Sequence, residues 1–281
     1  MKKKIHKYLE ILSVSYNSEH LIDNFLKQFD KRFKITLVEN SNNFSLKNNL
    51  EKKFKNLNVI ISGSDLGFGT AFNLGIKKIT SKYVLHLNPD VKINQINIYK
   101  LFNFLEQHPS AAVVSPKEML QEKKNKFKNR QVFLEVDSVK GFAMMLNVQI
   151  CKKTNFFDEN FFLYMEDIDF CKRLKFLNKK IYLLESAEAF HLGGKSHNPK
   201  LNFKMELERN WHFMWSLYYF NKKHYGKFFA IKVTLKKFIT SFLKKYLYFF
   251  LKNKKKHLIY KFRFEGLLNS YLNKKSFLRL I

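Results

Sequence analysis

The chain has 281 residues, 46% of them hydrophobic, and a formal net charge of +29 at pH 7. This length and hydrophobic content exclude a disordered chain and predict one large folded domain or a domain with an appendage. Two cysteines, Cys151 and Cys171, are too few for a disulfide framework and lack metal-ligand spacing, which indicates a reducing, cytoplasmic location. The basic N-terminus continues into a short strand pattern, so we predict no signal peptide.

The net charge of +29 indicates an anionic partner without identifying it. Nucleic acid, an anionic membrane surface and phosphorylated substrates are all consistent with it. A genome biased toward lysine and asparagine codons would also raise the charge without any function.

Short apolar runs alternate with amphipathic or polar stretches through the first part of the chain. The apolar runs predict strands at residues 11–15, 35–38, 59–62, 83–87 and 111–114. Helices are predicted between them, from about Leu21 to Phe29, over a polar stretch before residue 59, from Gly67 to Ile79, and from Ile96 to Gln107. Four βα units in succession predict a mostly parallel, right-handed α/β sheet flanked by helices.

In sheets of this kind, ligands bind at the carboxyl ends of the strands, and this sequence has its polar loops there. The loops are Tyr16-Asn17, Glu39-Asn40, Ser64-Asp65 and Asn88-Pro89-Asp90. We therefore expect several loops to meet at one crevice. The pair Gly67 and Gly69 suits either a tight turn or the approach of backbone amides to a phosphate. Asp90 suits either a hydrogen-bonded turn or a magnesium or manganese ligand.

The second part of the chain begins with a lysine-rich stretch at residues 121–130, which we expect to be an exposed excursion. Strand character returns at 136–139 and 141–146, with a bend at Gly141, and again at 181–184. His191 then precedes the loop Gly193-Gly194-Lys195-Ser196. In that position the imidazole could join Asp90 on a metal ion, while Lys195 or Ser196 could meet a phosphate.

Glu166, Asp167 and Asp169 form an acidic cluster at the start of a predicted helix, directly after the aromatic run from Phe161 to Met165. One interpretation is that the acids only stabilise the helix dipole. The alternative is catalytic, because apolar surroundings and neighbouring carboxylates raise a carboxyl pKa toward the range of a general base. Such a base suits removal of a proton from a hydroxyl group.

Six motifs occur in order along the chain. They are Val14-x-Tyr16-Asn17-Ser18-Glu19; Asp65-Leu66-Gly67-Phe68-Gly69 with Asn73-x-Gly75; Asn88-Pro89-Asp90; Gly141-Phe142-Ala143-Met144; the acidic segment from Phe157 to Arg173; and His191-x-Gly193-Gly194-x-Ser196. In this order they resemble the family 2 inverting glycosyltransferases, and among these the rhamnosyltransferase-like enzymes that build bacterial surface polysaccharides. The resemblance runs from about Ile11 to Gly226, since Arg209-Asn210 and the segment from Lys223 to Gly226 are also similar to that subgroup.

The resemblance implies a GT-A fold, a nucleotide-sugar donor, a glycan acceptor, inversion at the anomeric carbon and a divalent cation, Mg²⁺ or Mn²⁺. It assigns Asp90 and His191 to the cation and Asp167 to the catalytic base, with Glu166 beside it. The residues expected at the donor are Tyr16, Asn17, Glu39, Asp65, Gly67, Gly69, Asn88, Lys195 and Ser196. We expect a UDP- or dTDP-linked donor in preference to a GDP-linked one, and an acceptor presented on a lipid.

Two positions depart from the pattern of this family. Glu39 stands where an aspartate is commoner, which alters the expected nucleotide contacts. Asn88 replaces the first acid of an Asp-x-Asp motif, which makes the cation more dependent on His191.

Beyond Gly226 the composition shifts to lysine, phenylalanine, leucine and tyrosine. Lysines recur too often for a helix that spans a membrane, but the mixture fits amphipathic helices on an anionic bilayer surface. Helices that pack their apolar face on the catalytic domain are the alternative. We therefore predict a catalytic domain over 1–226, with a nucleotide-binding part at about 8–116 and an acceptor part at about 136–226, and a basic helical appendage over 227–281.

The sequence thus predicts an inverting glycosyltransferase that is peripheral on the inner face of the cell membrane. A non-catalytic relative that binds nucleotide sugars or glycans is a competing hypothesis, based on Asn88, and would show donor binding without turnover. A nucleic-acid-binding protein is a third, based on charge and aromatic content, and salt-sensitive binding to single strands would support it. No nucleic-acid-binding motif occurs, so we predict no nucleic-acid partner.

Overall fold

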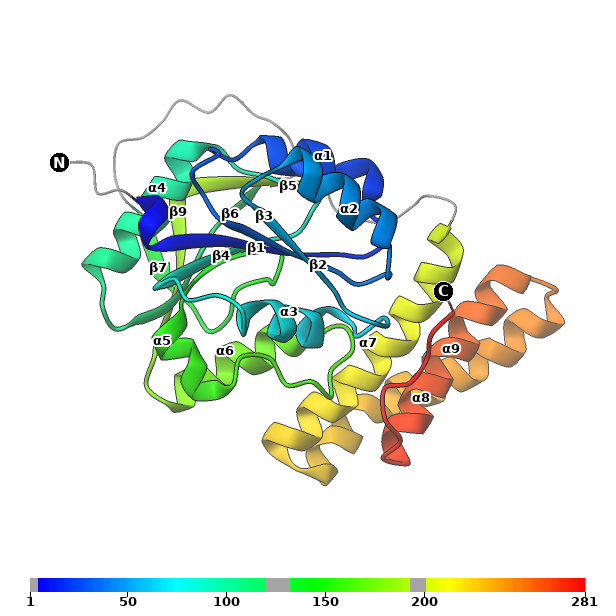
Figure 1. The fold of residues 1–281 in the computed structure, drawn as a ribbon. Helices are drawn as coiled ribbons and strands as arrows, with labels where there is room; N and C mark the ends of the chain where they lie inside the picture. The colour runs from blue at the N-terminus through cyan, green and yellow to red at the C-terminus, as the bar shows by residue number, and fades with distance from the viewer. Residues whose placement is uncertain (1–4, 120–131, 193–200, 281) are drawn as a thin grey trace. The chain divides into compact units, whose positions relative to one another are not determined.

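The computed structural model describes residues 5–119, 132–192 and 201–280 (Figure 1). The chain forms two compact units. The first comprises Met1–Asp158 and Asp167–Asn198, and the second comprises Glu159–Glu166 and Pro199–Ile281. The compact units thus divide near residue 199, whereas the expected division between catalytic and membrane-binding functions at Gly226 remains a prediction.

The first unit alternates strands and helices in the predicted order. Its strands are β1 (Leu9–Ser15), β2 (Ile35–Glu39), β3 (Leu57–Ile61), β4 (Tyr83–Leu87), β5 (Val91–Lys92), β6 (Ala111–Met119), β7 (Phe133–Glu135), β8 (Ala143–Asn147) and β9 (Lys180–His191). Its helices are α1 (Glu19–Lys27), α2 (Phe44–Lys53), α3 (Phe68–Ile76), α4 (Gln95–Gln107), α5 (Val148–Cys151) and α6 (Glu166–Phe176), the first residue of which belongs to the second unit.

The strands form one sheet in the order β3-β2-β1-β4-β8-β6-β9-β5, with β7 paired to β9. Strands β1 to β4 are parallel to one another, and β6 is parallel to β9, whereas β8 runs antiparallel between β4 and β6. The strand order turns back at β1 and β4, where open α/β sheets bind their ligands. The predicted α/β class and the parallel first half of the sheet are confirmed.

Alternate residues along the central strands supply two separate hydrophobic cores. Ile11, Leu37 and Leu85 face one core with apolar residues of α1 and α4, while Leu12, Val38 and Val84 face the other with residues of α3 and α6. Helices therefore cover both faces of the sheet, as Figure 1 shows, with α1, α2 and α4 on one side and α3 and α6 on the other. Burial on both faces explains why these strands read as continuous apolar runs.

The strand predicted at residues 136–139 is wrong. The strand in this region is β7, and the chain then runs without regular structure to β8. Val136 still donates its amide to Ile181, at 3.0 Å, but the next residues leave the sheet edge toward the end of β4. Residues 121–130, expected as an exposed excursion, lie outside the described residues.

The second unit contains the long helices α7 (Asn202–Tyr225), α8 (Lys227–Phe250) and α9 (Lys254–Tyr271). A Cβ atom built on Gly266 in α9 would lie 2.3 Å from the carbonyl oxygen of Trp211 in α7, so the two backbones are in direct contact. The segment after α9 runs along α7, where the Trp215 indole donates to the carbonyl of Lys274 at 2.9 Å. Among the described residues, no helix is both long enough and apolar enough to span a bilayer.

Candidate functional site

The sheet topology brings two distant segments to the carboxyl end of β4. Because β8 is antiparallel to β4, the residues that precede β8 lie beside the residues that follow β4, and the amide of Asn88 donates to the carbonyl of Phe142 at 2.9 Å. The short strand β5 pairs Val91 with His191 at the end of β9. Asp90 and His191, 101 positions apart in the sequence, therefore become neighbours.

The Asp90 carboxylate and the His191 imidazole face each other, with Nε2 of His191 3.5 Å from Oδ2 of Asp90. The other ring nitrogen of His191, Nδ1, lies 2.8 Å from Oε1 of Glu118 in β6. Glu118 in turn accepts a hydrogen bond from Lys140, at 2.5 Å. The ring of Phe142 stacks on the imidazole at 4.8 Å, with 5° between the ring planes, so His191 is held on several sides.

This chain of contacts sets the protonation of its members. The hydrogen bond to Asp90 raises the pKa of His191, burial lowers it, and the hydrogen bond to Glu118 raises it again, with a net increase. Burial raises the pKa of Glu118, but the hydrogen bonds from Lys140 and His191 outweigh that effect, so the net pKa falls.

The pair fits a divalent cation. Asp90 is 2% exposed, and its Oδ1 atom has no hydrogen-bond partner among the described residues, which is costly for a carboxylate unless another ligand uses that oxygen. The Asp90 carboxylate offers the hard oxygen that Mg²⁺ and Mn²⁺ prefer, and the imidazole nitrogen of His191 suits Mn²⁺ better than Mg²⁺. In the described part of the chain, no group of three or more histidine, cysteine or acidic side chains is arranged for a metal. A cation here would need further oxygen ligands from a substrate.

Asp167 lies in the first turn of α6, as predicted. Its Oδ2 accepts a hydrogen bond from the amide of Gly141, and its Oδ1 accepts one from the amide of Ile168, both at 2.8 Å. Burial raises the pKa of Asp167, and these backbone hydrogen bonds only partly oppose the increase. The carboxylate is therefore more basic than an ordinary aspartate and is fixed in position, both of which suit a general base.

Lys140, Gly141 and Phe142 form a site tripeptide that contacts Glu118, Asp167 and His191. Lys140 binds Glu118, the Gly141 amide binds Asp167, and the Phe142 ring stacks on His191. The candidate base and one of the two candidate cation ligands, His191, are thus held by three consecutive residues. Sequence reasoning missed Glu118 and Lys140, because no local spacing marks them and only the strand pairing brings them to the site.

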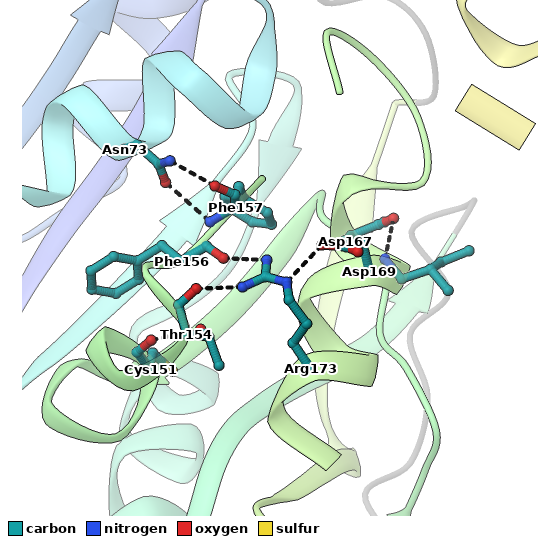
Figure 2. Close-up of polar contacts among 9 residues, drawn as sticks. Asn73, Cys151, Thr154, Phe156, Phe157, Asp167, Asp169 and Arg173 are labelled. Atoms are coloured by element: carbon teal, nitrogen blue, oxygen red, sulfur yellow. Dashed lines mark hydrogen bonds and ion pairs between the residues drawn. The ribbon is translucent and has the colours of Figure 1, made fainter. Parts of the chain in front are cut away.

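The other acids of the cluster have different surroundings. Asp169 is fully buried, and its Oδ2 lies 2.7 Å from Nε of Arg173. Figure 2 shows Arg173 also donating to the carbonyl groups of Thr154 and Phe156, so this ion pair anchors α6 to the preceding turn. Glu166 is buried and belongs to the second compact unit, whereas Asp167 belongs to the first.

The backbone before Glu166 is strained. Tyr164 and Met165 have φ angles of 70° and 69°, in the left-handed region that residues with side chains rarely adopt. Strain of this kind costs about 1–3 kcal/mol per residue and clusters at functional sites. Its position immediately before the acidic helix supports a functional role for that helix.

The Asn73-x-Gly75 motif is explained by packing. The side chain of Asn73 donates to the carbonyl of Phe157 at 2.8 Å and accepts from its amide at 3.1 Å, which Figure 2 shows. A Cβ atom on Gly75 would lie 2.6 Å from Leu12 and 2.8 Å from Val38, so only glycine lets α3 approach β1 and β2 this closely. The motif therefore positions α3 and the turn that leads to α6.

Glu39 and Asp65, the acids expected at the nucleotide, form hydrogen bonds with residues of the loops that follow β2 and β3. Glu39 is 1% exposed, and its carboxylate accepts hydrogen bonds from the hydroxyl of Ser15 at 3.2 Å and the amide of Ser41 at 2.9 Å. Asp65 accepts from the side chain of Asn40 at 2.8 Å and from the amide of Gly67 at 3.0 Å. As found, both carboxylates shape the loops after β2 and β3, and direct contact with a nucleotide remains a prediction.

The other residues expected to contact the nucleotide-sugar donor have the following surroundings. Gly67 has a φ of 72° and precedes α3, and Gly69 is buried in its first turn. The amides of Tyr16 and Asn17 donate to the hydroxyls of Ser18, at 3.2 Å, and Ser41, at 3.3 Å. Oδ1 of Asn88 is 3.3 Å from Nε2 of His86, a residue whose pKa burial lowers to about 4. Lys195 and Ser196 lie outside the described residues.

A cavity of about 550 Å³ in the first unit does not coincide with this site. Its lining includes residues of α1, β5, α4, β6 and β9, among them Lys27, Lys92 and Asn97, and none of the residues expected at the nucleotide-sugar donor or the cation. The candidate site is therefore defined by its side chains and not by this cavity.

Comparison with known families and proteins identifies related sequences. Residues 11–171 match the model of Glycosyl transferase family 2. The hexosyltransferase Agl10 of low-salt glycan biosynthesis in Haloferax volcanii is 25% identical over 207 residues, which cover 65% of this chain and 66%, just under two thirds, of that protein. The rhamnosyltransferase WbbL of Escherichia coli K12 is 23% identical over 250 residues, covering 76% of this chain and 92% of WbbL.

Solved structures share the fold. The mannosyltransferase PcManGT of Pyrobaculum calidifontis, in complex with GDP-Man and Mn²⁺, has a TM-score of 0.60 with 10% identity, covering 95% of this chain and 88% of PcManGT. TarS 1–349 of S. aureus, in complex with UDP-GlcNAc, has a TM-score of 0.54 with 14% identity, covering 95% of this chain and 92% of that structure. At these identities the similarity establishes the GT-A fold alone.

Proposed function

The chain belongs to glycosyl transferase family 2, and we propose that it transfers a sugar from a nucleotide-sugar donor to a glycan acceptor, with inversion at the anomeric carbon. The names of its relatives, a hexosyltransferase of glycan biosynthesis and a rhamnosyltransferase, support hexosyl transfer in glycan biosynthesis, and a surface polysaccharide as the product remains our expectation from the sequence resemblance. UDP- or dTDP-linked donors remain our expectation, although solved relatives hold either GDP-Man or UDP-GlcNAc.

The observation that supports this proposal most directly is the site tripeptide. It holds Asp167 through the Gly141 amide and His191 through the Phe142 ring, so a proton acceptor and a cation-binding pair share one support. Inverting transfer needs these two functions on the same substrate, one for the attacking hydroxyl and one for the leaving diphosphate.

In the proposed mechanism Asp167 accepts the proton of the acceptor hydroxyl as its oxygen attacks the anomeric carbon. Its raised pKa makes that transfer more favourable than for an ordinary aspartate. Asp90 and His191 would hold Mg²⁺ or Mn²⁺, which would supply positive charge for the departing nucleoside diphosphate. Glu118 keeps Nδ1 of His191 occupied, so that Nε2 is the nitrogen directed toward Asp90.

A panel of nucleotide sugars tests the proposal. Purified protein with Mn²⁺ or Mg²⁺ should hydrolyse one class of donor slowly and transfer it faster when an acceptor analogue is present. The configuration of the new glycosidic bond, followed by NMR, should be opposite to that of the donor. Tight donor binding with no turnover of any donor in the panel would instead support the non-catalytic relative.

The cation assignment has its own test. Asp90→Ala and His191→Ala should each raise the cation concentration needed for half-maximal activity, because each removes one ligand from the same ion. Chelator should abolish turnover, and added Mn²⁺ should restore it. Full activity in chelator without added cation would remove the cation from the mechanism.

We also propose that the enzyme works at the inner face of the cell membrane, where a lipid-linked acceptor would be presented. Residues 227–281 contain fifteen lysines and arginines and a single acidic residue, Glu265, which supports attraction to anionic lipid.

A further inference from the structure

The buried side chains of helix α8 in the second unit are small or polar, and the partly buried Ile231 and Phe238 pack beside them. Ala230, Thr234 and Ser241 are its buried residues. The Thr234 hydroxyl is 2.8 Å from the Tyr271 hydroxyl in α9, and Ala230 contacts the apolar cluster that α7 and α9 form with Leu267. Small side chains at these positions let α8 lie close to its neighbours.

The large apolar side chains of α8 lie on another side of the helix and are exposed. They form an outer stripe that consists of Phe228, Leu235, Ile239, Phe242, Leu243, Tyr246 and Phe250. Apart from the adjacent Phe242 and Leu243, successive members are three, four or seven residues apart, which keeps them on one face of the helix. Phe228 is 89% exposed and Phe250 is 76% exposed, and Leu247 and Phe249 add exposed apolar surface on either side.

Lysine side chains lie next to this exposed apolar surface. Helix α8 contains six lysines and no acidic residue, and the exposed Lys232 and Lys236 lie along the outer stripe. An exposed apolar surface of this length is unusual on a soluble protein unless it meets a partner. Large apolar residues bordered by lysines are typical of helices that lie in the interface of an anionic bilayer.

We propose that the outer stripe of α8 is the surface that docks on an anionic lipid bilayer, with its aromatic and aliphatic side chains among the acyl chains and its lysines at the headgroups. This deepens the proposed membrane location by naming the surface, and it rests on that proposal. It does not depend on the identity of the sugar.

A second copy of this chain fits the stripe less well than a bilayer. Two stripes packed together would bring two sets of α8 lysines within the distance of about 10 Å over which charges interact at 0.1 M salt. The helix offers no acidic residue to pair with them. A bilayer that contains anionic lipid satisfies both the apolar and the charged groups.

Direct insertion can be measured with the full chain. Phe250→Trp should show a blue-shifted emission when vesicles of 70% phosphatidylcholine and 30% phosphatidylglycerol are added, and brominated lipid should quench it. Phe44→Trp is the matched control, because Phe44 is 63% exposed at the start of α2 in the first unit. No shift is expected for Phe44→Trp.

Substitutions measure how much the stripe contributes. The triple variant Phe228→Gln, Leu243→Gln and Phe250→Gln should lower the vesicle partition coefficient at least tenfold and leave donor hydrolysis in solution within twofold of the wild type. Phe44→Gln, Ile96→Gln and Phe176→Gln, which replace side chains of similar exposure outside the second unit, should change neither. Lys232→Gln with Lys236→Gln should weaken binding several-fold and reduce its salt dependence.

Substitution is preferable to truncation after Gly226, because α9 and the segment after it cover buried residues of α7 such as Trp211 and Trp215. The proposal is overturned if the triple variant binds vesicles like the wild type, or if Phe250→Trp gives no shift. It is also overturned if the triple variant turns a dimer into a monomer, measured by analytical ultracentrifugation, while vesicle binding is unchanged. If the wild type hydrolyses no donor, the proposed enzyme activity is contradicted. The vesicle measurements would still decide whether the outer stripe binds a bilayer.

Discussion

Helices α4 and α8 are both rich in large apolar residues, yet α4 buries most of them and α8 leaves most of them exposed to solvent. In α4 the buried residues include Ile98, Leu101 and Phe102, which join the core on the face of the sheet that α1, α2 and α4 cover. In α8 the buried residues are small or polar, and the phenylalanines other than the partly buried Phe238 are exposed. The first unit uses apolar burial to build a scaffold for chemistry, whereas the second leaves apolar surface available for a partner.

The largest expected effect tests whether chemistry belongs to the first unit. Asp167→Asn should lower turnover by about a hundredfold or more, since it removes a general base. Donor affinity and vesicle binding should stay close to those of the wild type, because the fold and the α8 surface are untouched. Steady-state kinetics and vesicle sedimentation measure the two properties separately.

Two controls accompany Asp167→Asn. Glu166→Gln should lower turnover less, and Asp137→Asn, at an exposed aspartate whose ion pair with Lys175 is on the surface, should have no effect. Near-normal turnover of Asp167→Asn, or equal and modest losses in Asp167→Asn and Glu166→Gln, would remove Asp167 from the role of base.

The contrast between α4 and α8 can be measured directly as stability. Phe102 is 1% exposed, so Phe102→Ala should lower the free energy of unfolding by about 3–5 kcal/mol. Phe250→Ala should change it by no more than about 0.5 kcal/mol, as is usual for an exposed position. Urea denaturation of the full chain provides both values, and a loss of several kcal/mol in Phe250→Ala would mean that α8 buries this residue in solution.

A smaller effect is expected at Glu118, which contacts His191 and not the substrate. Glu118→Gln should weaken Mn²⁺ binding by about 10- to 100-fold, the usual effect of losing the group that orients a ligating histidine. Binding can be followed without turnover by electron paramagnetic resonance of free Mn²⁺. Unchanged Mn²⁺ affinity would mean that Glu118 has a structural role only.

The smallest effect concerns pH. Asp167 must be deprotonated to act as a base, so activity should rise with pH through its pKa, which burial raises above that of an ordinary aspartate. The charge of Lys140 lowers that pKa, so Lys140→Gln should move the acid limb of the kcat profile to higher pH. If the acid limb of Lys140→Gln does not move, it reports the titration of a group other than Asp167.

Local patterns were sufficient for much of the fold. The β4 strand from Tyr83 to Leu87 and the start of α6 at Glu166 agree with the predictions, because apolar runs and acidic helix starts are properties of adjacent residues. Spacing alone does not identify the buried face of α6: Ile168 stands at helical spacing from Cys171, yet Ile168 is exposed, whereas Phe170 is buried. Tertiary packing decides which of several apolar residues turns inward.

The sequence predicted only those candidate site residues that belong to a recognisable motif. Asp90 and His191 were named from their loops, but their proximity depends on β5, a strand of two residues that has no detectable periodicity. Glu118 and Lys140 become neighbours only when β6, β8 and β9 pair. Pairing between distant strands is a property of the whole sheet, so no window of sequence could have shown these contacts.

The site tripeptide has a consequence for how substitutions combine. Because Lys140, Gly141 and Phe142 touch both Asp167 and His191, a shift of this short segment displaces both groups together. Free-energy changes add when sites share no partner and depart from additivity when they do. A double-mutant cycle between Asp167 and His191 should therefore yield a coupling energy that differs from zero, and Gly141→Ala, whose added Cβ would meet its neighbours at ordinary contact distances, should alter that coupling while the protein stays folded.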